Sequence, residues 1–116
     1  MALRKFVDKL TKPVEELDRQ ELATWSAAHG DVPFDEVELR RPVRLAGEVS
    51  SVRIVPRVGG DALEATVHDG HASVTAVFLG RRKIHGLSPG RRVVLEGVVA
   101  KEHDGHLMYN PIYTLQ

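Results

Sequence analysis

The sequence contains no cysteine, which excludes disulfides, thiol nucleophiles and thiolate metal sites. It also has no apolar run near the roughly 20 residues that a membrane-spanning helix needs. Charged residues are mixed among the apolar ones at the start of the chain, and neither a continuous apolar stretch nor a small-residue cleavage site follows. We therefore expect a cytoplasmic protein with no secretory signal and no membrane contact.

No recognisable catalytic pattern occurs in the chain. It has no glycine-rich phosphate-binding loop, no dinucleotide-binding glycine pattern and no Gly-x-Ser-x-Gly motif. Asp69 and Asp104 are assigned to turns, and no nucleophile stands beside a base in a recognisable order. We expect neither catalysis nor a cofactor.

Length and composition indicate one ordinary soluble domain. The chain has 116 residues, of which 42% are hydrophobic and 28% charged, and compact domains typically need about 100 to 150 residues. The net charge is zero but unevenly divided: residues 1–36 hold five Lys/Arg against eight Asp/Glu, and residues 37–116 hold eleven against eight. We interpret residues 1–36 as a helical extension with a linker and residues 37–116 as a mildly basic domain.

The N-terminal part has the pattern of a helix. A capping-type Thr11 precedes Pro13, which suits a first helical turn, and acidic residues follow. The pattern predicts a helix from about Pro13 to about His29 and a shorter one from about Ala2 to Leu10. Apolar residues recur at helical spacing, at Val14, Leu17, Leu22, Trp25 and Ala28. This stripe packs either on the outside or end of the following domain, or on a second copy or another partner, and Leu17, Leu22 and Trp25 are the candidate partner-binding residues.

Five β runs follow, and the order of elements favours a barrel. A long first strand, firm from Val43 to Val55, is expected to bend at Gly47. One or two helical turns are predicted over Arg81 to Leu87, between the third and fourth strands, and the last strand, Leu107 to Leu115, is expected to kink at Pro111. Five strands with one such insert are typical of an OB-fold barrel. The expected fold class is mainly β, a five-stranded OB-fold barrel with an N-terminal α-helical extension.

Alternation predicts which faces of the second and third strands are buried. The inward sets are Leu63, Ala65 and Val67 on one strand and Val74, Ala76 and Phe78 on the next. A register slip of one residue would exchange the inward and outward sets.

The C-terminal two thirds of the chain resembles the OB-fold nucleic-acid-binding family. The residues that carry the resemblance are Asp69-Gly-His-Ala-Ser-Val-Thr-Ala-Val-Phe-Leu-Gly80, Leu87-Ser-Pro-Gly90, Val94-Leu-Glu-Gly-Val98 and Leu107-Met-Tyr-Asn-Pro-Ile-Tyr113. Within that family they are similar to the wedge domain of the RecG branch-migration helicase, although the chain has no helicase domain. The resemblance implies a small stand-alone bacterial OB protein that binds single-stranded or branched DNA, or RNA.

Cations of the barrel are the candidate nucleic-acid contacts. Arg53 and Arg57 lie four apart on the first strand and would share a face, where guanidinium groups can stack on bases or pair with phosphates. A solvated surface face is an equally good interpretation of the clusters. The full candidate set is Arg44, Arg53, Arg57, Arg81, Arg82, Lys83, Arg91, Arg92 and Tyr109.

Aromatic residues are scarce, at only 5% of the chain. Tight single-strand binders place aromatic rings under successive bases, each worth about 1–3 kcal/mol. Trp25 lies in the predicted helix, Phe34 in the linker, and Phe78, Tyr109 and Tyr113 on strands where a core position is the commoner role. The composition favours a weak, salt-sensitive mode of binding that depends on arginine.

One tetrapeptide occurs twice, as His68-Asp-Gly-His71 and His103-Asp-Gly-His106. If both are hairpin turns at one end of the barrel, four imidazoles could approach one another and bind a metal. Asp-Gly is also the preferred dipeptide of a type I′ hairpin turn, which explains both copies without a ligand. We favour the turn and predict no metal site.

Two functional hypotheses of different class remain. The first is a nucleic-acid-binding module, which predicts affinity that falls steeply with added salt. The second is a protein–protein interaction module that uses the N-terminal helix for a partner or for self-association, and it predicts a concentration-dependent mass that is lost on Trp25→Ala.

Overall fold

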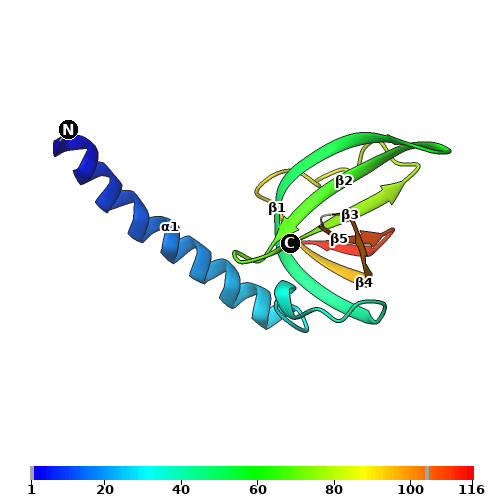
Figure 1. Cartoon of the computed structure of the whole chain (residues 1–116), viewed down its shortest axis with the longest axis horizontal. Helices are drawn as coiled ribbons and strands as arrows, with labels where there is room; N and C mark the ends of the chain where they lie inside the picture. Colours follow the sequence, from blue (N-terminus) through cyan, green and yellow to red (C-terminus); the bar gives the residue numbers. More distant parts are fainter. Residues whose placement is uncertain (1, 104) are drawn as a thin grey trace.

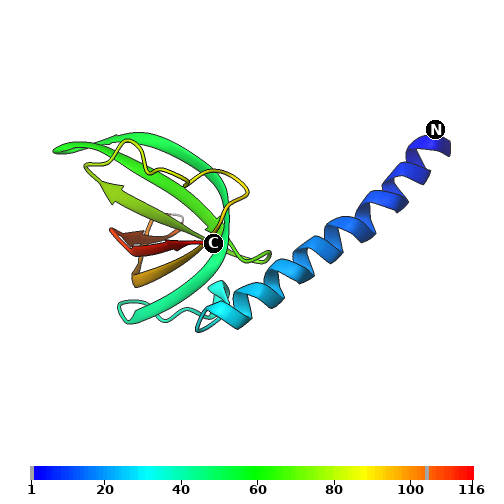
Figure 2. The same ribbon diagram turned by 180° about the vertical axis from the view of Figure 1, so that it is seen from behind.

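The computed structural model describes residues 2–103 and 105–116, with the backbone alone for residues 2–13. Across these residues the chain forms one long helix, α1 (Ala2–His29), a short 3-10 helix, η1 (Phe34–Glu36), and six strands. The strands are β1 (Pro42–Arg57), β2 (Gly60–His68), β3 (Ser73–Leu79), β4 (Arg92–Glu102), β5 (Gly105–Tyr109) and β6 (Ile112–Leu115). Figures 1 and 2 show the first half of α1 projecting away from a closed group of strands.

The sheet closes into a ring in the order β1-β2-β3-β5-β4, because β1 pairs with both β2 and β4. The β3–β5 pair is parallel, and all other pairs are antiparallel. The predicted barrel is confirmed. Its last strand is divided into β5 and β6 at Asn110 and Pro111, where Asn110 has a φ of 47°.

The first strand changes partner where it bends. Residues 42–48 pair with β4 and residues 48–57 with β2, and a bulge follows between Val49 and Ser51. A Cβ added to Gly47 would lie 2.6 Å from the His68 carbonyl oxygen and 2.8 Å from Val67 Cγ1. The predicted bend is therefore present, and a side chain at Gly47 would collide with β2.

The core confirms both predicted inward sets, since Leu63, Ala65, Val67, Val74, Ala76 and Phe78 are all buried inside the barrel. The predicted outward face of β2 and β3 is not simply solvated, however. Glu64 and Val77 are also buried, at 6% and 0% exposure. Both lie on the outer side of the sheet, where Glu64 pairs with Arg53 and Val77 pairs with Tyr109.

Two local predictions were wrong. The expected break before Pro13 is absent, and one helix runs through it. The proline loses one backbone hydrogen bond and its ring crowds the carbonyl four residues earlier, but most residues on both sides are good helix formers. The segment after β3 contains no helical turn. Gly86 has a φ of 83° and interrupts any helix there, while Ile84 and Leu87 still close the barrel end as buried side chains.

The linker contributes to the core. Phe34 is 1% exposed and belongs to the main cluster of buried residues. Its backbone N–H donates to Asp69 Oδ2 at 2.9 Å, and Asp69 Oδ1 accepts from the N–H groups of His71 and Ala72 at 3.0 and 2.9 Å. Asp69, itself only 3% exposed, therefore ties η1 to the β2–β3 loop.

The structure corrects the predicted type I′ turn at the first His-Asp-Gly-His segment. His68 and Ser73 are the last pair of β2 and β3, so the loop has four residues and Asp69 acts as a buried acceptor. In the second segment, Glu102 pairs with Gly105, and His103 has a φ of 47°. Asp104 lies outside the described residues.

Acid should weaken the fold through Asp69. Burial of this carboxylate would raise its pKa, but the three backbone N–H donors outweigh burial and hold the pKa below its usual 3.8. A group with a lowered folded-state pKa stabilises the fold above its unfolded pKa, and that stabilisation is lost as the pH falls through the folded value. We expect Asp69→Asn to lower the free energy of unfolding at pH 7 by about 1–3 kcal/mol and to flatten its fall below about pH 4.

Urea unfolding of Asp69→Asn across pH 2.5–7 measures this effect. The exposed Asp35, in the same region, supplies the control Asp35→Asn. Equal pH profiles for the two variants would contradict the assignment.

Candidate nucleic-acid interface

The candidate interface is the outer face of β1, β2, β3 and β5. Arg53 lies opposite Glu64 in the β1–β2 pair, Glu64 opposite Val77 in the β2–β3 pair, and Val77 opposite Tyr109 in the β3–β5 pair. Residues paired across neighbouring strands point to the same side of a sheet, so these four side chains share one face. We call this surface the β1–β5 face.

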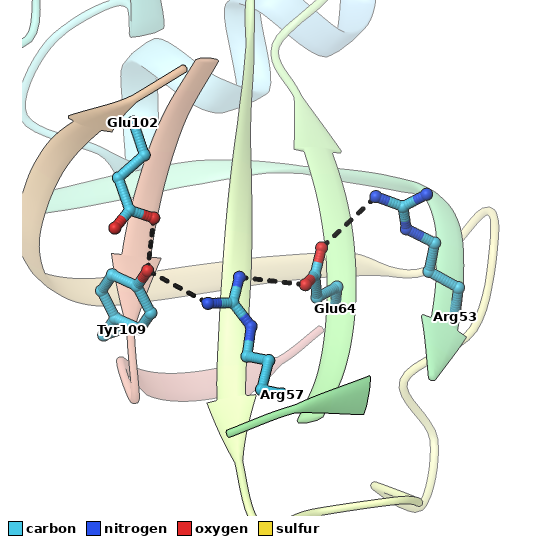
Figure 3. A network of polar contacts seen from close by, with 5 residues as sticks. All are labelled: Arg53, Arg57, Glu64, Glu102 and Tyr109. Carbon is cyan, nitrogen blue, oxygen red and sulfur yellow. Dashed lines mark hydrogen bonds and ion pairs between the residues drawn. The ribbon is translucent and has the colours of Figure 1, made fainter. Parts of the chain in front are cut away.

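A chain of polar contacts crosses the β1–β5 face (Figure 3). Arg53 Nη2 lies 3.4 Å from Glu64 Oε1, and Arg57 Nη2 lies 3.1 Å from Glu64 Oε2. Arg57 Nη1 donates to the Tyr109 hydroxyl at 3.3 Å, and that hydroxyl donates to Glu102. Glu64 therefore contacts both arginines at once. This is possible because Arg53 and Arg57, four apart on β1, share one face of the strand.

These contacts shift two pKa values in the same direction. The hydrogen bond with Glu64, helped by the one with Tyr109, raises the pKa of the Arg57 guanidinium despite its partial burial. The hydrogen bond to Glu102 and burial raise the pKa of the Tyr109 phenol above 10.0, against the lowering effect of Arg57. Near neutral pH the face therefore presents a charged Arg57 beside a neutral phenol.

The face has an open apolar depression at its end. Pro56, Arg57, Val58, Leu79 and Tyr109 line a volume of about 750 Å³. Val58 is fully exposed in the β1–β2 loop, and Leu79 is 46% exposed. The Arg57 guanidinium carbon lies 5.5 Å from the centre of the Tyr109 ring, and Arg57 Nε is buried without a hydrogen-bond partner among the described residues. The flat faces of bases pack on apolar surfaces of this kind, while their polar edges can meet nearby donors.

Of the other predicted cations, Arg81, Arg82 and Lys83 come closest to this face. They follow β3 and are exposed, and Arg82 Nη1 lies 3.4 Å from Asp61 Oδ2 beside the β1–β2 loop. The N–H of Gly80 also donates to the Asp61 carbonyl at 3.0 Å. This cluster therefore borders the end of the face that holds Val58.

Three further candidate arginines lie elsewhere. Arg44, on the half of β1 that pairs with β4, bonds Glu96 at 3.0 Å. Arg92 sits over the Trp25 ring at 5.1 Å and pairs with Glu21 at 3.6 Å, so it belongs to the contact between α1 and the barrel. Arg91 is exposed and immediately precedes β4.

The candidate partner-binding residues are also divided. Leu22 is 3% exposed in the contact between α1 and the barrel, and Trp25 is half-buried between Arg92 and a stacked His29. Leu17 is 63% exposed. Packing of the stripe on its own domain therefore accounts for Leu22 and Trp25 but not for Leu17.

Sequence reasoning missed Glu64 and Glu102. Glu64 alternates with the predicted inward residues Leu63 and Ala65, but no sequence pattern indicates the register that places it opposite Arg53. Tyr109 and Tyr113 lie four apart and would share a face on one continuous strand. The break after Tyr109 separates them, so Tyr113 packs edge-on against Phe78, with ring centres 5.5 Å apart.

In the part of the chain that the structure describes, no three or more His, Asp or Glu side chains gather as metal ligands. No helix in the same residues is long and apolar enough to cross a membrane.

The barrel matches a known family of domains. Residues 43–115 match the model of the family named for the tRNA anticodon and described as an OB-fold nucleic acid binding domain. The match covers all six strands apart from the first residue of β1. No curated protein and no solved structure matches the chain.

Proposed function

Since the chain belongs to the OB-fold nucleic-acid-binding family, we propose that it is a non-catalytic protein that binds single-stranded or branched nucleic acid on the β1–β5 face. The observation that carries this proposal is the placement of Arg53, Arg57 and Tyr109 together beside an apolar depression. Strands 2 and 3 of such barrels, with the neighbouring loops, are the usual ligand surface.

Each group on the face has a distinct role in the proposed complex. Arg53, whose side chain is 71% exposed, reaches solvent and pairs with phosphate. Arg57 is more enclosed and is fixed by Glu64 and Tyr109, so its guanidinium is a preorganised donor for a second phosphate at the edge of the depression that receives a base. Glu64 is a positioning residue, because its two oxygens hold the two arginines without exposing its own charge.

The exposed apolar groups supply the rest of the binding surface. Leu79 and Val58 extend the depression toward the Arg81–Lys83 cluster. A strand lying across the face would place bases on the depression and its backbone along the cations. Because Glu64 and Glu102 offset the charges of Arg53 and Arg57, the long-range attraction is small and binding is weak.

Salt dependence is the first test. About five phosphate contacts, from Arg53, Arg57, Arg81, Arg82 and Lys83, give a slope of about −3.5 for log affinity against log salt on a single strand. We expect affinity to fall roughly 100-fold between 50 and 200 mM salt. Fluorescence anisotropy with labelled single-stranded DNA, single-stranded RNA and forked DNA measures the slope for each ligand.

The three ligands separate the finer alternatives. Preference for forked DNA supports the likeness to a helicase wedge domain, and preference for RNA supports the likeness implied by the name of the matching family. Absence of binding to all three at 20 mM salt would overturn the proposal. A protein–protein interaction module remains the second candidate function, favoured by the exposure of Val14 and Leu17 on α1.

A further inference from the structure

Two apolar side chains near the middle of α1, those of Val14 and Leu17, are not covered by the barrel. Val14 and Leu17 are 57% and 63% exposed. Among residues 14–29 of α1 the buried positions are Leu22 and Ser26, which lie about 80° to 180° round the helix from Val14 and Leu17 at 3.6 residues per turn. Trp25, half-buried beside Arg92, lies only about 20° round the helix from Val14. The barrel therefore contacts the C-terminal half of α1, whereas the N-terminal half projects away from the barrel (Figure 2).

The same spacing continues toward the N-terminus. Apolar residues stand at helix positions 3, 7, 10, 14 and 17, which are separated alternately by four and three residues. Leucine occupies positions 3, 10 and 17, and valine occupies positions 7 and 14. Regular alternation of this kind is the pattern by which one helix packs along another. We call these five residues the 3–17 stripe.

Charge along α1 is reversed with respect to its dipole. Residues 2–13 hold four Lys/Arg and one Asp, and residues 14–29 hold one Arg and four Asp/Glu, which gives +3 and −3. The first turn has no acidic residue. A helix favours acidic residues near its N-terminus and basic ones near its C-terminus, so the helix dipole does not account for this distribution.

An antiparallel partner with the same sequence accounts for both observations. When two copies of α1 run in opposite directions, the basic half of each lies beside the acidic half of the other, whereas parallel copies would oppose like charges. We propose that this protein self-associates through the 3–17 stripe, with α1 of one copy antiparallel to α1 of a second. The two barrels then stand at opposite ends of the helix pair, and each keeps its β1–β5 face.

Sedimentation velocity over a concentration series tests the association. The wild-type protein is expected to move from monomer to dimer with rising concentration, less readily at 500 mM than at 50 mM salt because screening weakens the ion pairs. Val14→Ser/Leu17→Ser is expected to remain monomeric at concentrations where the wild type is dimeric. The control is Ile112→Ser, at an apolar residue that is 68% exposed on β6, and it is expected to dimerise normally.

Disulfide trapping tests the orientation without removing the stripe. The chain has no cysteine, so introduced thiols are the only ones. Arg4 and Asp18 each follow a leucine of the stripe, at its opposite ends. The two single variants, Arg4→Cys and Asp18→Cys, are oxidised separately and as a mixture. Antiparallel pairing predicts a disulfide-linked heterodimer in the mixture and little cross-linking of either variant alone.

Three results would overturn the proposal. They are a monomer at every concentration, dimerisation that survives Val14→Ser/Leu17→Ser, and efficient cross-linking of each cysteine variant with itself. Helix content by circular dichroism shows that each variant has kept α1. None of these results depends on whether the barrel binds nucleic acid.

Discussion

Replacing Arg53 and Arg57 together by glutamine is expected to weaken binding of a single strand by roughly 30- to 150-fold, which corresponds to about 2–3 kcal/mol. Two charge-assisted hydrogen bonds in a buried site would contribute more than this. The Arg53 side chain is 71% exposed, however, so solvent screens its contribution to the binding free energy. The slope of log affinity against log salt should become shallower by about 1.4, since two phosphate contacts are lost. Anisotropy titrations at four salt concentrations give both quantities.

Arg41→Gln/Arg44→Gln is the matched control. It also removes two positive charges, but at a different place. Arg44 lies on the part of β1 that pairs with β4 and contacts Glu96, and Arg41, just before β1, contacts Glu38. Its effect should stay within about threefold, because only the long-range field of the protein changes. Equal losses in the two double variants would contradict a binding face at Arg53 and Arg57 and indicate a response to net charge alone.

The architecture of the barrel was predictable because it depends on local patterns. Alternation of apolar residues in 62–68 and 73–79 indicated the inner faces of β2 and β3, and both sets are buried as predicted. The bend at Gly47 and the interruption at Pro111 followed from residue chemistry within one strand. Each of these inferences needed only the residues of a single segment and the period of a β-strand.

The composition of the candidate site was only partly predictable, because it depends on register between strands. Arg57 and Tyr109 are 52 residues apart, and the parallel β3–β5 pair is what brings them together. No motif records that pairing. The alternation placed Glu64 outside the inward set but did not predict its burial, which two arginines make tolerable by pairing with its charge.

The linker was misjudged for a related reason. Asp31-Val-Pro-Phe-Asp35 has the composition of a loop, and nothing nearby indicates that one of its residues enters the barrel. The space for Phe34 arises at the bend of β1, where its Cζ atom would lie 2.9 Å from a Cβ built on Gly47. Glycine 13 residues later in the chain thus makes room for the ring, a complementarity that exists only after folding.

Phe34→Ala is expected to lower the free energy of unfolding by about 3–5 kcal/mol, the usual range for removing a fully buried phenylalanine ring. For a domain of this size that loss corresponds to a fall in Tm of roughly 10–20 °C. Thermal and urea unfolding measure it, and Val58→Ala, at a fully exposed residue of the β1–β2 loop, should change stability by less than about 0.5 kcal/mol. The backbone N–H that bonds Asp69 remains in the alanine variant, so the loss reports the ring itself.

If the free energy of unfolding of Phe34→Ala lies within 1 kcal/mol of the wild-type value, the ring does not seal the barrel. If the full loss is observed, the segment between α1 and β1 belongs to the barrel core, and the attachment of α1 to the domain that carries the β1–β5 face is rigid at that point.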